Sequence, residues 1–253
     1  MSRRTKCNIA GVQVDIISKD ELQQSIEASV RLQKKDVYSY VNIHAINLAQ
    51  KDDEFADLLN NALVVYCDGE GVRLGARILG RKLPPRVVLT YFIWELCAVC
   101  EQSGMTMFFL GSRPGVAEQA VAIMTKRYPR LAIVGWHHGY FDKTGAESNR
   151  IVELVNSVKP NILFVGFGMP AQEQWIGRNF AALHANAILP CGSMIDYAAG
   201  KKNLAPFWMS NNGMEWLYRL FQEPGRLWKR YLLGNPVFMI RIIVQRLIGW
   251  KQG

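Results

Sequence analysis

The chain has 253 residues, of which 49% are hydrophobic and 20% charged, and its net charge is +9. This balance excludes a disordered or fibrous protein and leaves enough apolar material for one large α/β domain, alone or with an appendage. Positive charge gathers after residue 200, which suggests either a polyanionic partner (anionic lipid, pyrophosphate or nucleic acid) or simply a solvated basic face.

Cysteine usage and the N-terminus indicate a cytoplasmic protein. Five cysteines are scattered along the chain, and the pair Cys97 and Cys100 falls in a helical-looking run, so we expect buried thiols in a reducing compartment. The basic N-terminus lacks a long apolar segment, because Gln13 and Asp15 interrupt it. No stretch reaches the ~18 uncharged apolar residues of a membrane span. We therefore expect a protein that does not cross a bilayer.

Strands and helices alternate over the first 190 residues. Residues 7–17 predict two short strands around Gly11, and Ser18 with Glu21 forms a capping box that starts a helix. Further strands are expected at 37–42, 63–67, 105–110, 131–136, 161–166 and 187–190, with helices at 44–60, 71–79, 91–102, 115–127, 146–158 and 172–183. The strands are continuous apolar runs, typical of a parallel sheet buried on both faces. The predicted fold is an α/β domain over residues 1–204, with a Rossmann-like parallel sheet flanked by helices.

After Ala205 the strand signal ends and helices follow, with breaks expected at Pro224 and Pro236. This segment has cations and an apolar stripe at helical spacing: Arg219, Arg226, Lys229 and Arg230 on one side, and Trp216, Leu220, Leu227 and Tyr231 on the other. Such a pattern suits a helix at a membrane interface, although a helical cap packed on the sheet is the alternative. We predict that residues 205–253 form a basic, amphipathic, membrane-binding helical appendage.

Ligands of open parallel sheets bind beyond the carboxyl ends of the strands, so the residues that follow each strand are the candidates for a site. Asp68 follows the strand at 63–67 and begins a glycine-rich turn, where it is suited to act as a general base or, more plainly, to cap a helix. Asn42 ends the strand at 37–42 and lies either beside a ligand or in an ordinary turn.

Three further segments carry candidate binding residues. Gly111 and Arg113 follow a strand in a glycine-rich turn that resembles a phosphate cradle without the ending of a nucleotide-binding P-loop. Arg86 follows two prolines, in a rigid loop that could face a pyrophosphate. Gln172 stands at the start of a helix, where an amide can read sugar hydroxyls or a nucleobase, or only cap the helix.

No metal or cofactor is expected from the sequence. His137 and His138 lack companion ligands at metal spacing, and the pair Asp68 and Glu70 only superficially resembles the acidic pair of metal-dependent glycosyltransferases. The glycine fingerprint of dinucleotide enzymes is missing after the first parallel strand. A nucleic-acid partner is not expected either, because basic and aromatic residues do not interleave on a recognisable module.

Taken together, these segments resemble the WecG/TagA/CpsF family of bacterial glycosyltransferases from about residue 8 to residue 236. The ordered blocks that carry the resemblance are 63–72, 75–80, 108–117, 137–141, 166–175, 205–208 and 215–224. The resemblance implies an inverting enzyme that works without a metal. It would transfer glucose, N-acetylmannosamine or its uronic acid from a UDP-sugar onto a polyprenyl-diphosphate-linked saccharide in surface or exopolysaccharide synthesis. It would act peripherally on the inner, anionic face of the cell membrane.

The same resemblance implies roles for individual residues. Asp68 matches the catalytic base, and Asn42, Arg86 and Gln172 match pocket residues. In the tail, Arg219, Arg226 and Lys229 match positions that close over the diphosphate.

Two departures from the family pattern leave an alternative open. Tyr40 replaces a common threonine, and the segment Leu89-Thr90-Tyr91 lacks a common carboxylate. A catalytically inactive nucleotide-sugar-binding or scaffolding protein at the membrane is therefore the second reading. A homo-oligomer is also compatible with the sequence.

Overall fold

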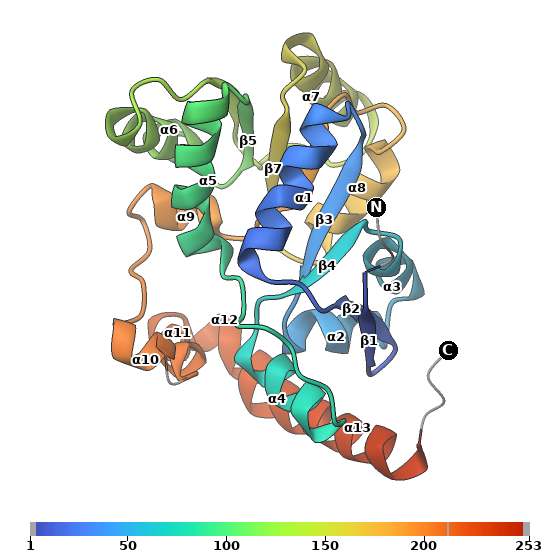
Figure 1. Cartoon of the computed structure of the whole chain (residues 1–253). Coiled ribbons are helices and arrows are strands. Elements are labelled where there is room, and N and C mark those ends of the chain that lie inside the picture. Colours follow the sequence, from blue (N-terminus) through green and yellow to red (C-terminus); the bar gives the residue numbers. More distant parts are fainter. Residues whose placement is uncertain (1–3, 212, 250–253) are drawn as a thin grey trace.

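The centre of the protein is a six-stranded, all-parallel sheet, seen in a computed structural model that describes residues 4–211 and 213–249 (Figure 1). The sheet order is β4–β3–β8–β7–β5–β6. Its strands are β3 (Asp36–Val41), β4 (Val64–Cys67), β5 (Met107–Gly111), β6 (Ile133–His137), β7 (Ile162–Gly166) and β8 (Ala187–Pro190). The predicted α/β class with a buried parallel sheet is confirmed.

A small antiparallel hairpin precedes the sheet. Strands β1 (Lys6–Ile9) and β2 (Val12–Asp15) pair with Ile9 opposite Val12, so that Ala10 and Gly11 form the turn. Both turn residues have positive φ, as two-residue hairpin turns of this kind require. The two short strands predicted around Gly11 are confirmed.

Helices cover both faces of the sheet, as its alternating side chains require. Phe109 and Phe164 stack with ring centroids 5.0 Å apart on one face, whereas their neighbours Phe108 and Val165 belong to the core of the other face. The first face is covered by α1 (Lys19–Arg31), α5 (Leu89–Ser103), α6 (Val116–Arg127) and α9 (Met194–Ala198). The second is covered by α2 (Ile43–Ala49), α3 (Asp53–Asn60), α4 (Glu70–Ile78), α7 (Gly145–Val158) and α8 (Ala171–Asn179).

Two local predictions within the sheet region need correction. The single helix expected at 44–60 is divided into α2 and α3, because Asp52 caps a new helix by accepting a hydrogen bond from the backbone N–H of Phe55 at 2.9 Å. The short helix α9 was not expected. It follows β8 directly and adds Met194 and Ile195 to the core.

The C-terminal region is helical, as predicted, but Pro236 does not break it. Its elements are α10 (Phe207–Asn211), α11 (Glu215–Gln222), α12 (Pro224–Trp228), a π-helical segment η1 (Lys229–Leu233) and α13 (Gly234–Ile248). Pro224 starts a helix as expected, and from there the chain remains helical for 25 residues. The wider π turn immediately before Pro236 explains the error, since such bulges accommodate residues that do not fit the regular hydrogen-bond ladder.

Helix α13 packs along α4 and shares a core with residues 1–204 (Figure 1). Phe238 and Ile242 are fully buried there, and a Cβ atom on Gly75 of α4 would lie only 2.7 Å from the ring of Phe238. By length and composition alone, Pro224–Ile248 is also apolar enough to cross a membrane, which the sequence analysis did not anticipate; 22% of its most apolar stretch is buried inside the protein. The end of the helix that was predicted to reach Trp250, together with Lys251, lies outside the described residues.

Candidate active site

The sheet topology makes the carboxyl ends of β5 and β7 a candidate position for a ligand. The chain leaves β5 toward β6 but leaves the neighbouring β7 toward β8, and parallel sheets bind ligands at such a reversal of direction. Here the two backbones approach closely: a Cβ atom on Gly111 would lie 2.5 Å from the carbonyl oxygen of Gly166. The predicted cradle residue Gly111 therefore serves this close approach, and Arg113 is exposed at the rim just beyond it.

Asp68 and Asn42 meet at the adjoining edge of the sheet. The backbone N–H of Asp68 donates to the carbonyl of Val41 at 2.9 Å, which extends the β3–β4 pairing to this residue. Asn42 caps α2 by accepting from the N–H of Ala45 at 3.2 Å, while its side-chain amide donates to the Asp68 carboxylate. Gly69 permits the contact, because a Cβ there would lie 3.1 Å from Asn42.

Arg86 fastens the C-terminal helices over this edge. Its guanidinium donates to Glu215 of α11 at 2.8 Å, and to the hydroxyl and carbonyl oxygens of Ser210 at 2.9 and 3.1 Å. Both partners of the Arg86–Glu215 ion pair keep only 16% of their side-chain surface exposed. Arg219, one helical turn after Glu215, approaches the same carboxylate at 4.0 Å. The predicted residues Arg86 and Arg219 thus share the carboxylate of Glu215, and the charges of both interact with that of Asp68.

The electrostatic environment of Asp68 suits a base that works near neutral pH. Burial and the nearby charge of Glu215 raise the pKa of Asp68 from 3.8 to about 6, against the opposing effects of Arg86, Arg219 and the hydrogen bond from Asn42. A carboxyl group with this pKa is ionised at pH 7 yet is a stronger base than an ordinary aspartate.

We expect the activity of this site to rise with pH around pH 6, because only the ionised form of Asp68 can accept a proton. In Glu215→Gln the neighbouring negative charge is gone, so the pKa of Asp68 falls and the rise moves to lower pH. Profiles of kcat/KM against pH for both proteins measure this shift. An unchanged or upward-shifted profile would contradict the assignment.

Arg230 is a further candidate for the site, and it was not among the residues predicted from the sequence. It is half-buried in the π-helical segment, and its charge interacts with the charges of Arg219 and Asp68. Burial and Arg219 lower the pKa of Arg230, and among the described residues no carboxylate forms an ion pair with it. His44 lies beside it: burial, Arg230 and Arg226 lower the pKa of this histidine to about 4, so the ring is neutral at pH 7.

The other two predicted tail cations lie nearer the surface. Arg226 pairs with Glu223 and leaves 59% of its side chain exposed. Lys229 is exposed, with its Nζ 5.5 Å from the ring centre of Trp228. One signal for Arg230 was available in the sequence: it follows Arg226 by four residues and therefore shares its helix face. Its burial was not readable, because that depends on the π turn.

Gln172 is fully buried and is hydrogen-bonded to two loops of the site. Its side-chain oxygen accepts from the N–H of Gly192, after β8, at 2.9 Å and from that of Gly168, after β7, at 3.2 Å. Its amide nitrogen donates to Glu173 at 2.8 Å and lies 3.5 Å from the hydroxyl of Tyr40. In this structure Gln172 joins the two loops, and the Tyr40 ring lies against this junction.

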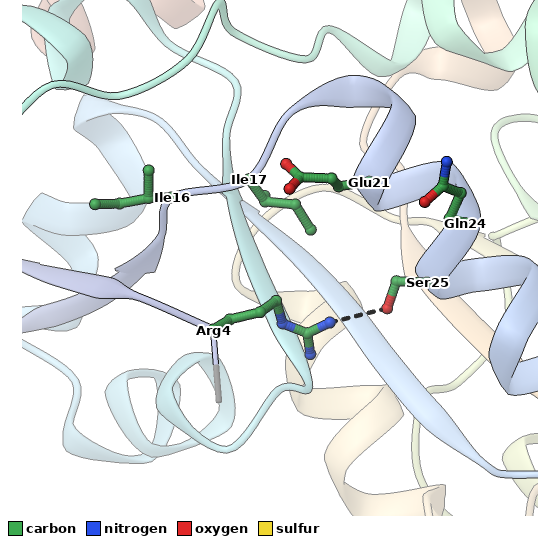
Figure 2. Close-up of a pocket in the computed structure, with 6 residues that line it drawn as sticks. All are labelled: Arg4, Ile16, Ile17, Glu21, Gln24 and Ser25. Carbon is green, nitrogen blue, oxygen red and sulfur yellow. Dashed lines mark hydrogen bonds between the residues drawn. The ribbon is translucent and has the colours of Figure 1, made fainter. Parts of the chain in front are cut away.

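Two other features lie outside this constellation. Among residues 4–211 and 213–249, no group of three or more His, Cys, Asp or Glu side chains is placed to hold a metal ion, and Glu70 is bound by Arg73 at 2.7 Å. Figure 2 shows a pocket of about 250 Å³ near α1, where Arg4 donates to Ser25 at 3.0 Å and to the carbonyl of Leu63 at 2.8 Å. Since Leu63 precedes β4, this pocket lies at the opposite end of that strand from Asp68.

Known proteins resemble this chain over nearly its whole length. The profile of the family described as "Glycosyl transferase WecG/TagA/CpsF family" matches residues 7–252. Two relatives from Staphylococcus aureus, strains MW2 and COL, are each 28% identical over 245 residues, which cover 95% of this chain and 93% of the relative. Both are named N-acetylglucosaminyldiphosphoundecaprenol N-acetyl-beta-D-mannosaminyltransferase.

Proposed function

Because this chain belongs to the glycosyl transferase WecG/TagA/CpsF family, we propose that it moves a sugar, with inversion, from a UDP-sugar onto a polyprenyl-diphosphate-linked saccharide. Membership of this family identifies the chain as a glycosyltransferase. The acceptor class is supported by the names of the S. aureus relatives, which act on a sugar joined through a diphosphate to undecaprenol. The sugar of the UDP-sugar donor is proposed to be glucose, N-acetylmannosamine or its uronic acid.

The proposed reaction uses Asp68 as the base. The acceptor hydroxyl attacks the anomeric carbon and gives its proton to the Asp68 carboxylate, while the bond between that carbon and the diphosphate of UDP breaks. UDP leaves with the bonding electrons and gains negative charge. Arg219, Arg226 and Arg230 stabilise that charge from the C-terminal helices, and Lys229 contributes from the rim.

One observation carries this proposal: the Arg230 guanidinium, which forms no ion pair within residues 4–211 and 213–249, interacts electrostatically with the Asp68 carboxylate, whose pKa is raised. A cation taken from water without an ion-pair partner costs free energy, and an incoming diphosphate would offset that cost. We propose the remaining pocket roles from the contacts described above. Asn42 orients Asp68, Arg86 holds the tail in place or contacts a phosphate, and Gly111 with Arg113 forms the rim toward the donor. Gln172 holds the loops that bound the sugar.

We also propose that the enzyme binds peripherally to the inner face of the cell membrane, through residues 205–253. Leu227 and Tyr231, expected on the lipid-facing stripe, are instead buried. Trp216 of that stripe is exposed, and so are many other apolar side chains of these helices: Phe221, Trp228, Leu232, Leu233, Val237, Ile240, Ile243, Val244, Leu247 and Ile248. The inner side of α13 is held to the domain by Arg241, which donates to Asn47 at 2.8 Å, and by Gln245, which accepts from Ala10 at 2.8 Å. These contacts favour a helix that lies on the membrane over one that crosses it.

A transfer assay tests the proposed function directly. The protein is incubated with a panel of UDP-sugars and short-chain lipid-diphosphate sugars, and UDP release is measured with and without a chelator. We expect acceptor-dependent UDP release that resists the chelator, because cationic side chains replace a metal at the leaving group. Strict dependence on a divalent ion would contradict that part of the proposal. UDP-sugar binding without any transfer would favour the scaffolding alternative, for which the Tyr40 substitution is the specific reason.

A further inference from the structure

A cationic pocket lies outside the active site, at the C-terminal end of α4. It has a volume of about 280 Å³ and is lined by Arg73, Arg77, Gly80, Arg81, Lys82 and Leu83. Four of these six residues are cations, of which Arg73 pairs with Glu70, and none of the four has a role in the proposed chemistry. A concentration of positive charge around a hollow is the arrangement that binds phosphate groups.

The end of α4 brings these cations together. Gly80 has a φ of +76°, and the N–H of Arg81 donates back to the carbonyl of Ala76 at 2.8 Å, so the chain turns sharply as in a glycine-capped helix end. Arg77 before the turn and Lys82 after it therefore line the same hollow. Both are exposed, and none of the ion pairs within residues 4–211 and 213–249 involves either of them.

The outer face of α13 runs next to this pocket. Figure 1 shows α13 lying along α4, and Arg246 of α13 approaches Gly80, with its Nη1 3.6 Å from the position that a Cβ atom would take there. The neighbours of Arg246 on the outer side are apolar: Ile243 is 48% and Leu247 79% exposed. Cations thus border an exposed apolar ridge, which is the arrangement of a surface that enters the headgroup region of a bilayer.

We infer that the α4 pocket binds the phosphate of an anionic lipid headgroup while the apolar ridge of α13 enters the acyl boundary beside it. This inference rests on the proposed peripheral binding to the membrane and extends it to residues of the α/β domain. A soluble phosphate would meet the same cations, but it would leave the apolar ridge uncovered. Charge complementarity and the ridge together therefore favour the lipid. A contact on α4, in addition to the tail, would fix how the enzyme is rotated on the membrane and hence where Asp68 faces.

The test compares binding of the full-length protein to vesicles of phosphatidylcholine with and without phosphatidylglycerol. Each Lys or Arg near an anionic surface contributes about 1 kcal/mol, so Arg77→Gln/Lys82→Gln should bind the anionic vesicles roughly 30-fold more weakly. The matched control is Lys126→Gln/Arg150→Gln, which removes the same charge from exposed positions on α6 and α7, away from α4. Arg77→Lys/Lys82→Arg, which keeps the charges, should bind like the wild type.

Equal vesicle binding by the pocket variant and the control would overturn the inference. If inorganic phosphate binds the wild type and not the pocket variant in titration calorimetry at constant ionic strength, while vesicles bind both proteins equally, the occupant is a soluble phosphate and the inference also fails. The proposed glycosyl transfer is measured in a separate assay, by UDP release with a short-chain acceptor in solution. This activity should be the same in the pocket variant and the wild type, because neither Arg77 nor Lys82 belongs to the active site.

Discussion

Replacing Asp68 with asparagine should lower turnover by about 10²–10⁴-fold, the usual contribution of a positioned general base, while UDP binding survives. Asparagine keeps the shape of the side chain and its hydrogen bond with Asn42, but it cannot accept the proton of the acceptor hydroxyl. Steady-state UDP release and calorimetric titration with UDP measure the two effects. The control is Glu70→Gln, which removes a nearby carboxylate that Arg73 binds and which should remain active.

Asp68→Asn should also make the folded protein more stable at pH 7. The pKa of Asp68 is about 6 in the folded protein, whereas its reference value is 3.8. Protonated Asp68 therefore adds to the free energy of unfolding below pH 3.8, and this contribution is lost as the pH rises through 6. A shift of about two units corresponds to about 3 kcal/mol, which partial exposure reduces to roughly 1–2 kcal/mol. Urea unfolding should show this gain at pH 7 and a smaller one near pH 4. A stability loss at pH 7 would instead identify Asp68 as a turn residue, and full turnover would refute its role as the base.

Replacing Arg230 with glutamine should lower kcat by about 10²–10³-fold, as is typical when one group that stabilises developing charge is removed. The adjacent Lys229→Gln is the matched control: it removes an equal charge from an exposed position beside Trp228 and should cost far less. Kinetics with a short-chain acceptor in solution keep any effect on membrane binding out of the comparison. Comparable losses in the two variants would contradict the assignment of Arg230 to the leaving diphosphate.

Stability provides an independent check on Arg230. Because burial and the neighbouring Arg219 lower the pKa of Arg230, keeping this side chain charged in the folded protein costs free energy, although it remains protonated at pH 7. Arg230→Gln should therefore leave the urea midpoint unchanged or raise it. UDP should stabilise the wild type more than the variant, since a diphosphate relieves the unpaired charge only when Arg230 is present. A variant that unfolds more readily and responds to UDP like the wild type would point to a structural role.

The sequence by itself determined the sheet and the residues at its carboxyl edge. Continuous apolar runs such as the one at residues 161–166 can only be buried on both faces, and the carboxyl ends of neighbouring parallel strands must lie together. The meeting of Asn42 and Asp68 follows from those two facts. Local chemistry also fixed the start of α1, where the cap between Ser18 and Glu21 forms as expected.

Only the tertiary structure decided how the C-terminal helices use their cations. Sequence spacing places Lys229 and Arg230 in the same basic segment, but their burial differs: Arg230 is half-buried and Lys229 is exposed. The ion pair between Arg86 and Glu215, which holds this segment to the sheet edge, joins residues far apart in the chain. For the same reason, Pro236 does not end the helix, and Leu227 faces inward instead of toward lipid. Periodicity tells which residues share a helix face. What that face meets depends on how the helix docks, which here is set by the packing of Phe238 and Ile242 against α4.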